Sequence, residues 1–340
     1  MRALTGAEAK VIGALLGSGL ENQSEWLLRS GVPRSTFSVI RNRAFSEGWI
    51  CERGVPSPDI GFRYILFALA RPHVEGVEEL ARTWSEEKAA VLVWQAPEMV
   101  FGAFFLRTDG EVGELASRMR QGGMFHEISF WNVQASGSRL PVYFDYEGVW
   151  GHVCGSPTVF YPRSLPFPQT GGDYGAPSDG LVKKAGEMLN RPFRGGAVAG
   201  EVRRMGPSGF PRSWRKMLDQ EWVSWRTFPD FARLPPYRER AISRVTIIHG
   251  DLVAGADPAD LFKKLVEECR VFPFLYAMDG KHFLMGAMGT GDQSAGSGDR
   301  TRPVLPTLEG SLSGIAATSC EVQRVKVVLN HRYERLFGTV

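Results

Sequence analysis

Residues 31–50, GVPRSTFSVIRNRAFSEGWI, decide the fold of the amino-terminal part of the chain. The Gly-Val-Pro at 31–33 predicts a tight turn, with the proline near the first turn of a helix that runs to about residue 45. Phe37, Ile40 and Ala44 have the spacing of one buried helical face. The segment therefore predicts a helix that packs on one side and exposes the other.

The surroundings of this helix extend the pattern. Two shorter helices are expected before it, at 7–16 and 21–29, and Thr5 with Glu8 has the capping-box spacing that begins the first. A short strand and a loop rich in Gly and Pro follow it. Three helices, a turn before the third, then a strand and loop are typical of a winged helix-turn-helix. We predict this fold for residues 1–60.

From residue 62 the apolar pattern changes to that of strands alternating with helices. FRYILFALA and HEISFWNVQA are expected to be the first and last strands, with helices at 73–87 and 111–121 and two strands between them. The order βαββαβ is that of a ferredoxin-like domain. We predict one over 61–153, with an added hairpin at its end, followed by a linker rich in Pro and Gly at 154–178.

The same order of elements returns beyond the linker. GFPRS at 209–213 repeats the GVPRS at 31–35, and it begins a second helix of the recognition type, followed by a wing interrupted by prolines at 226–237. The repeat strongly supports both domain predictions, because two independent errors of interpretation should not produce the same order of helices and strands. The predicted fold class is α+β, with the winged-helix and ferredoxin-like pair repeated twice in one chain. The predicted second copy consists of a divergent winged-helix-like domain (179–240) and a ferredoxin-like domain (241–340), whose elements are a strand (242–250), a helix (258–269), two strands (271–289), a helix (306–317) and a final strand (321–330).

Composition narrows the class of protein. The chain has 340 residues, 43% of them hydrophobic and 23% charged, which favours packed domains over disorder. The net charge of +3 is compatible with a nucleic-acid partner but does not argue for one. Four scattered cysteines without a C-x-x-C pair, and no long apolar segment or signal peptide, favour a reduced, cytoplasmic protein without a membrane partner.

The exposed side of the helix at 34–45 carries the candidate DNA-binding residues. Arginine and asparagine can read guanine and adenine in the major groove, and serine and arginine also contact phosphates. The alternative is the solvated face of an ordinary helical domain. The predicted base-reading residues are Arg34, Ser35, Ser38, Arg41 and Asn42, with Arg43 and Arg53 on phosphates. The more basic second unit either contacts DNA through Arg212, Arg215 and Lys216 or serves as a pairing platform.

This arrangement resembles the leucine-responsive (AsnC-like, feast-famine) family of transcription regulators. The resemblance rests on GVPRSTFSVIRNRAFSEGWI and on the strand-helix-strand-strand order of 62–107, repeated at 242–290. It implies double-stranded DNA as a partner, small-molecule sensing by the sheet domains, and a fused repeat that acts as a pseudo-dimer, with a homodimer of whole chains as a further option. On this interpretation the chain is a transcription regulator, not an enzyme, and it has no cofactor.

Siroheme decarboxylases share the two-domain plan and are the alternative, which would make the chain a tetrapyrrole-processing lyase. The strand ISRVTIIHG, with His249, is similar to a strand of those enzymes. The His- and Tyr-rich stretch expected just before it is replaced by LPPYR at 234–238, which counts against the alternative. The six histidines show no metal-ligand spacing, so no metal site is predicted and each is expected to be a structural or surface residue, with His249 the least improbable ligand.

Overall fold

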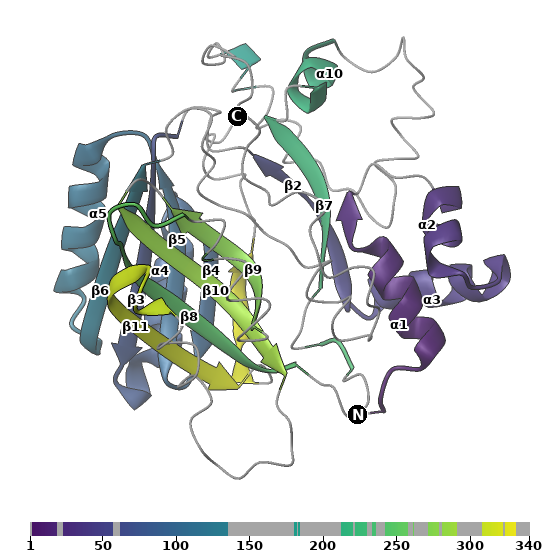
Figure 1. Cartoon of the computed structure of the whole chain (residues 1–340), viewed down its shortest axis with the longest axis horizontal. Helices are drawn as coiled ribbons and strands as arrows, with labels where there is room; N and C mark the ends of the chain where they lie inside the picture. The colour runs from purple at the N-terminus through teal and green to yellow at the C-terminus, as the bar shows by residue number, and fades with distance from the viewer. Residues whose placement is uncertain are drawn as a thin grey trace.

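The computed structural model describes residues 2–18, 23–56, 62–134, 180–181, 183, 212–219, 222–229, 233–235, 242–257, 261, 271–278, 281–290, 308–321 and 324–330. Within them, three amino-terminal helices lie beside two antiparallel sheets that pack face to face (Figure 1). The fold is thus mixed α/β on antiparallel sheets. Outside these residues lie the predicted hairpin and linker before residue 179, and nearly all of the helix predicted at 258–269.

The three predicted amino-terminal helices are present. The capping box forms as the sequence indicates: the Glu8 backbone N–H donates to Thr5 Oγ1 at 3.2 Å, and the Thr5 N–H donates to the Glu8 carboxylate at 2.9 Å. Gly31, before the third helix, has φ 59°, a conformation that side chains with a Cβ rarely adopt. The helices are α1 (Gly6–Leu15), α2 (Gln23–Ser30) and α3 (Arg34–Ser46), and Phe37, Ile40 and Ala44 of α3 are buried as predicted.

The strand after α3 does not form a wing within its own unit. The central strand of a three-stranded sheet, β7, comes from the second half of the chain and pairs with β2 on one side and β1 on the other. The sequence analysis assigned no strand partner to the wing expected at 226–237; residues 226–229 of it belong to β7, and the helix before it ends at Asp219. The strand pattern alone does not say which edge a strand will join, because any free edge offers the same hydrogen bonds. The elements are β1 (Gly17–Ser18), β2 (Ile50–Pro56), α10 (Arg212–Asp219) and β7 (Val223–Pro229).

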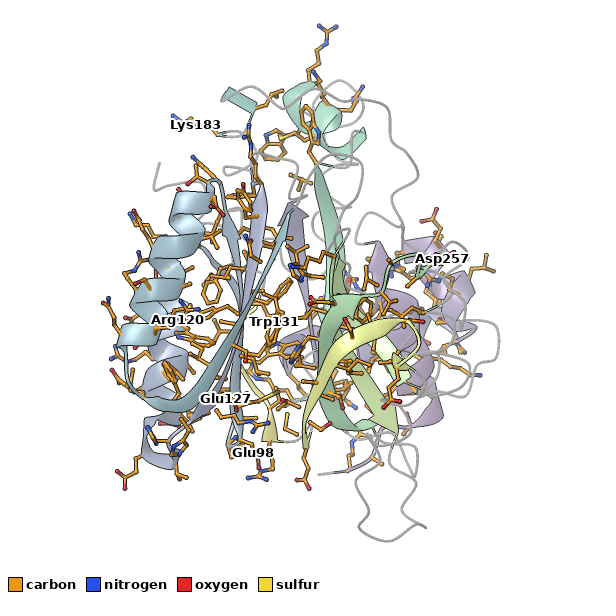
Figure 2. The ribbon with its side chains drawn as sticks, turned by 60° about the vertical axis from the view of Figure 1, so that its left-hand side comes forward. Glu98, Arg120, Glu127, Trp131, Lys183 and Asp257 are labelled. Atoms are coloured by element: carbon orange, nitrogen blue, oxygen red, sulfur yellow. The ribbon has the colours of Figure 1, made fainter. Side chains whose placement is uncertain are left out.

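The βαββαβ order predicted for the first half is present in a five-stranded sheet. Its strand order is β12-β4-β5-β3-β6, so the outermost strand, β12, again comes from the second half. An ion pair between Arg324 and Glu98 (2.6 Å) lies beside this junction (Figure 2). The elements are β3 (Tyr64–Pro72), the short helix η2 (Val74–Gly76), α4 (Val77–Glu86), β4 (Ala90–Ala96), β5 (Met99–Leu106), α5 (Asp109–Gln121), β6 (Phe125–Gln134) and β12 (Lys326–Asn330).

One strand of the four-stranded sheet lies where the sequence predicts a helix. A helix was expected at 306–317, but the chain forms a strand that pairs with β8, with a register shift between Ser313 and Ala316 where Gly314 has φ 61°. The final strand predicted at 321–330 is divided between this strand and β12. Pairing with a neighbouring sheet edge overrides weak helix propensity. The strand order is β11-β8-β10-β9, with β8 (Ile242–Leu252), β9 (Val271–Met278), β10 (His282–Thr290) and β11 (Leu312–Glu321).

Successive side chains of a strand point to opposite faces of its sheet, and the apolar side chains on the two faces form two separate cores. Phe67 and Phe101 of the five-stranded sheet pack in one cluster with Ile247 and Leu284 of the four-stranded sheet. The opposite face of the five-stranded sheet packs against α4 and α5, with Trp84 at 1% exposure. The layer between the two sheets therefore joins both halves of the chain (Figures 1 and 2).

Two buried threonines on central strands lead to opposite predictions. Thr227 is 2% exposed, and its hydroxyl has no hydrogen-bond partner among the described residues. Thr246 is 9% exposed, and its hydroxyl lies 2.7 Å from Ser319 Oγ. Because a buried unpaired hydroxyl costs about 1–3 kcal/mol, we expect Thr227→Val to raise the thermal unfolding midpoint and Thr246→Val to lower it. Calorimetry of both variants checks this, and shifts of the same sign would contradict it.

Candidate functional site

His249 lies in the layer between the two sheets. On β8 it alternates with Val245 and Ile247, so the three side chains share the face turned toward the five-stranded sheet. Its neighbours across the strands are Leu284 of β10 and Ala316 of β11. From the facing sheet, Trp131 of β6 brings its ring centroid within 3.9 Å of the imidazole centroid, at an interplanar angle of 42°. Figure 2 shows Trp131 between the sheets.

The environment keeps His249 neutral. Burial lowers its pKa from 6.5 to about 4, and the carboxylate of Asp251 only partly opposes this shift. The side chain therefore carries no charge at neutral pH and has a free lone pair on one ring nitrogen. A neutral imidazole is the form that binds metal ions and accepts protons.

A second histidine lies at the end of the same face. His282 Nδ1 is 2.7 Å from Asp251 Oδ1, and the two residues are partners in the β8–β10 register. Asp251 follows His249 by two residues, about 7 Å along the strand. His282 is 30% exposed and Asp251 51%, so this pair lies where the buried face opens to solvent. We call His249, Trp131, Asp251 and His282 the inter-sheet histidine site.

Only one member of this site was visible in the sequence. His249 was singled out as the least improbable ligand among the histidines, whereas Trp131, Asp251 and His282 were missed. The antiparallel pairing of β8 with β10 could have suggested the Asp251–His282 contact, since both strands were predicted. Trp131 belongs to the other half of the chain and carries no local signal, because its position depends on how the two sheets pack.

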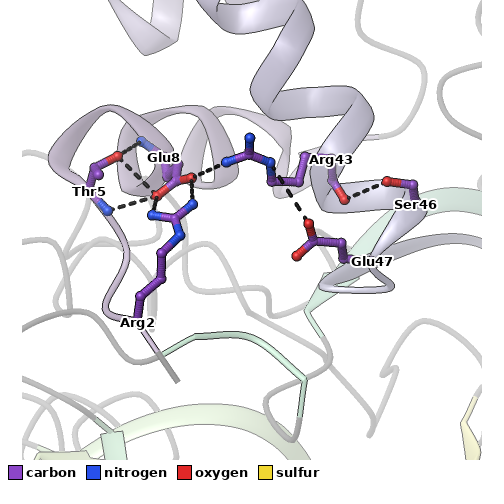
Figure 3. Close-up of polar contacts among 6 residues, drawn as sticks. All are labelled: Arg2, Thr5, Glu8, Arg43, Ser46 and Glu47. Atoms are coloured by element: carbon purple, nitrogen blue, oxygen red, sulfur yellow. Dashed lines mark hydrogen bonds and ion pairs between the residues drawn. The ribbon is translucent and has the colours of Figure 1, made fainter.

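The structure places much of the predicted DNA-reading face in contacts within its own domain. Arg43 pairs with Glu8 at 3.1 Å and with Glu47 at 3.8 Å (Figure 3). The guanidinium carbon of Arg41 lies 5.8 Å from the ring centroid of Trp26, a cation–π distance. The Ser38 hydroxyl donates to the Arg34 carbonyl at 3.0 Å. Of the seven residues predicted in the first unit, Arg34, Ser35 and Asn42 are exposed on α3, and Arg53 lies on β2 opposite Arg226 of β7.

The basic residues predicted in the second unit lie on α10. Arg212, Arg215 and Lys216 are exposed there, and Lys216 Nζ is 5.7 Å from the ring centroid of Trp222. On the same short helix Trp214 and Met217 are buried. These basic side chains come from a different element than those of α3.

Comparison with known proteins gives one informative likeness. No family model matches the chain, and neither does any curated protein. The structure is similar to that of the siroheme decarboxylase NirDL in co-complex with an iron-uroporphyrin III analogue, with a TM-score of 0.50 at 12% identity over 97% of both chains. A further crystal structure of this decarboxylase gives a TM-score of 0.48 at 12% identity over 97% of both chains. An anthrone oxidase-like protein gives 0.34 at 6% identity, over 81% of this chain and 96% of that one.

At 12% identity the first likeness establishes an overall fold shared with that decarboxylase along nearly the whole chain, and a shared fold does not by itself establish function. The prediction of a transcription regulator gains no support from these comparisons. Within the described ranges, no helix is long and apolar enough to cross a membrane.

Proposed function

We propose that the chain binds an iron tetrapyrrole at the inter-sheet histidine site and removes CO2 from it, as a lyase of the siroheme decarboxylase type. The observation that carries this proposal is His249, a neutral imidazole packed against Trp131 between the sheets. Its support from outside the chain is the fold shared over 97% of both chains with a decarboxylase whose crystal structure contains an iron-uroporphyrin III analogue. Sequence reasoning ranked this function second.

The residues of the site suit such a ligand. A neutral histidine can donate its lone pair to iron, and the flat face of an indole can pack on a macrocycle. Val245, Ile247 and Leu284 supply the apolar surface around the imidazole that a large aromatic ligand needs. Together these side chains fit a flat, iron-containing aromatic molecule better than a small polar metabolite.

Removal of CO2 also needs a proton. The carbon–carbon bond to the carboxylate breaks, CO2 leaves, and the electron pair left on carbon takes up one proton, so no oxidant or reductant is consumed. His282 is the residue suited to pass that proton from water. Its Nδ1 is hydrogen-bonded to Asp251 at the end of the site that faces solvent. His249, with its pKa held at about 4, is a poor proton donor at neutral pH.

A titration with iron-uroporphyrin III tests the proposal. We expect the wild-type chain to shift the visible absorption of the tetrapyrrole, and His249→Ala to bind it at least about tenfold more weakly. His73→Ala, which removes an exposed histidine at a distance from the site, is the matched control and should bind like the wild type. A separate incubation of the chain with siroheme, followed by mass spectrometry, then shows whether CO2 is lost. Equal binding by wild type and His249→Ala would reject the proposal.

DNA binding is the second candidate function, because α3 has no acidic residue in its first turn and exposes Arg34, Ser35 and Asn42. On this proposal Ser38, Arg41 and Arg43 support the helix from within the domain. Phosphates would be contacted from the other elements. A salt-dependent gel shift of Arg34→Ala against the wild type separates this function from the first. The residues proposed for phosphates are Arg53, Arg212, Arg215 and Lys216.

A further inference from the structure

Two exposed histidines meet at the end of the five-stranded sheet. His73 follows the last residue of β3, and His126 is the second residue of β6, the strand beside it. His73 Nδ1 lies 3.0 Å from His126 Nε2, and the ring centroids are 3.9 Å apart at 74°. His126 and Trp131 lie on opposite faces of β6, five residues apart, so this pair is separate from the inter-sheet histidine site.

The backbone positions both histidines. The His73 N–H donates to the carbonyl of Met124 at 3.0 Å, and the His73 carbonyl accepts from Gly76 at 2.8 Å, which holds the start of η2. His126 lies at a register shift of β6 against β3, between Phe125, which pairs with Pro72, and Glu127, which pairs with Arg71. One imidazole is attached to a strand and the other to a hydrogen-bonded turn. The backbone of both residues is therefore already ordered, so little conformational entropy is lost when they bind a common ligand, and this favours affinity.

The distance between the nitrogens selects the class of ligand. A metal bound to both atoms at about 2.0–2.1 Å, with the nitrogens about 3.0 Å apart, has an angle of roughly 90° between these bonds. That angle suits the adjacent positions of an octahedral or square-planar ion and is smaller than the tetrahedral angle of a structural zinc site. Imidazole suits Ni²⁺ and Cu²⁺, which have these geometries.

No group of three or more His, Cys, Asp or Glu side chains that could hold a metal occurs in the part of the chain that is described. The nearby carboxylate of Glu127 pairs with Arg71 at 3.3 Å. Water would therefore complete the coordination, and such an open site binds and releases its ion readily. Both imidazoles are exposed, so an ion reaches them directly from solvent.

We propose that His73 and His126 form a two-imidazole binding site for a divalent transition-metal ion of octahedral or square-planar preference, represented by Ni²⁺ and Cu²⁺. The two nitrogens that now contact each other turn toward the ion, which replaces their hydrogen bond. The site does not depend on the proposed tetrapyrrole function, since it shares no residue with the inter-sheet histidine site.

Calorimetric titration of the untagged, metal-stripped chain with NiCl2 at pH 7.5 tests this site. We expect one site that His73→Ala and His126→Ala each weaken at least about tenfold, because each change removes one of two ligands. His282→Ala is the matched control, a partly exposed histidine outside the site, and should leave Ni²⁺ binding unchanged. Since His73 and His126 are exposed, alanine should not disturb folding, and equal melting temperatures verify this.

Electron paramagnetic resonance with one equivalent of Cu²⁺ gives a second measurement. Coupling to two imidazole nitrogens is expected in the wild type, and coupling to fewer in each single variant. Absence of Ni²⁺ binding by the wild type would reject the proposal and leave the two histidines as a hydrogen-bonded pair only. Binding that both alanine variants retain would equally reject it, by placing the ion elsewhere on the chain.

Discussion

Phe101→Ala is expected to lower the free energy of unfolding by about 3–5 kcal/mol, the largest effect of any single change considered. Phe101 is fully buried on β5, in the layer between the two sheets. Its ring lies 6.0 Å from that of Phe67 at 14° and 5.7 Å from that of Trp94 at 47°. Truncation removes these contacts and leaves a cavity that two hydrogen-bonded sheets cannot easily close.

Urea unfolding followed by circular dichroism measures this loss. Val39→Ala is the matched control, because Val39 on α3 is 60% exposed and its truncation should change stability by no more than about 0.5 kcal/mol. Since the layer that contains Phe101 joins both halves of the chain, one transition should shift as a whole. A loss of less than about 1 kcal/mol, or a shift confined to one of two transitions, would show that the sheets are not packed as described.

Glu8→Ala is expected to have the second largest effect, a loss of about 2 kcal/mol. The carboxylate of Glu8 is 4% exposed and accepts hydrogen bonds from Thr5, Arg2 and Arg43 (Figure 3). It therefore caps α1 and ties α1 to α3 at the same time. Loss of a cap costs about 0.5–2 kcal/mol, and the contribution of the two ion pairs is reduced because the side chains of Arg2 and Arg43 are 54% and 42% exposed.

The pH dependence of stability identifies this carboxylate. Burial acts to raise the pKa of Glu8, but hydrogen bonds from Arg2 and Thr5 outweigh it and lower the pKa from 4.5 to about 2. The unfolded chain thus binds the proton first, so the stabilisation is fully present above pH 4.5 and is lost as the pH falls toward 2. We expect Glu8→Gln to flatten the stability profile in this window. An unchanged profile would assign the acid sensitivity to other groups.

His249 also makes the stability of the fold depend on pH, over a neighbouring pH range. Its pKa is lowered by burial from 6.5 to about 4, so the unfolded chain takes up this proton before the folded one does. Stability from this group therefore falls between pH 6.5 and 4, above the range in which Glu8 acts. The two contributions can be separated because the windows meet only near pH 4 to 4.5.

The parts of the fold that follow from short-range sequence were predicted well. Thr5 and Glu8 are three residues apart, and the capping box needs nothing else. The apolar spacing of Phe37, Ile40 and Ala44 likewise identified the buried side of α3. Strands β3 to β5 are short, nearly continuous apolar runs, and together with β6 they were recognised in the right order. In each case the chemistry lies within one element or between close neighbours.

The errors share a different physical origin. The strand β11 was predicted as a helix because its small residues favour neither state strongly, and the edge of β8 decided the outcome. The sequence pattern placed β2 and β7 in two separate winged-helix units. In the structure these two strands pair with each other, although about 170 positions of the chain separate them. The sequence pattern also gives no sign that the helical unit brings Trp26 to Arg41, and Glu8 and Glu47 to Arg43.

The sequence by itself determined the amino-terminal helices and the strands of the first half, and it singled out His249 among the histidines. Only the tertiary structure decided that β7 and β12 complete sheets of the first half, and that His249 lies against Trp131 with Asp251 and His282 beside it. The physical reason is that helix caps and apolar periodicity act over a few residues. Strand edges and sheet faces instead take whichever partner the folded chain brings near, and the candidate site lies where two such faces meet.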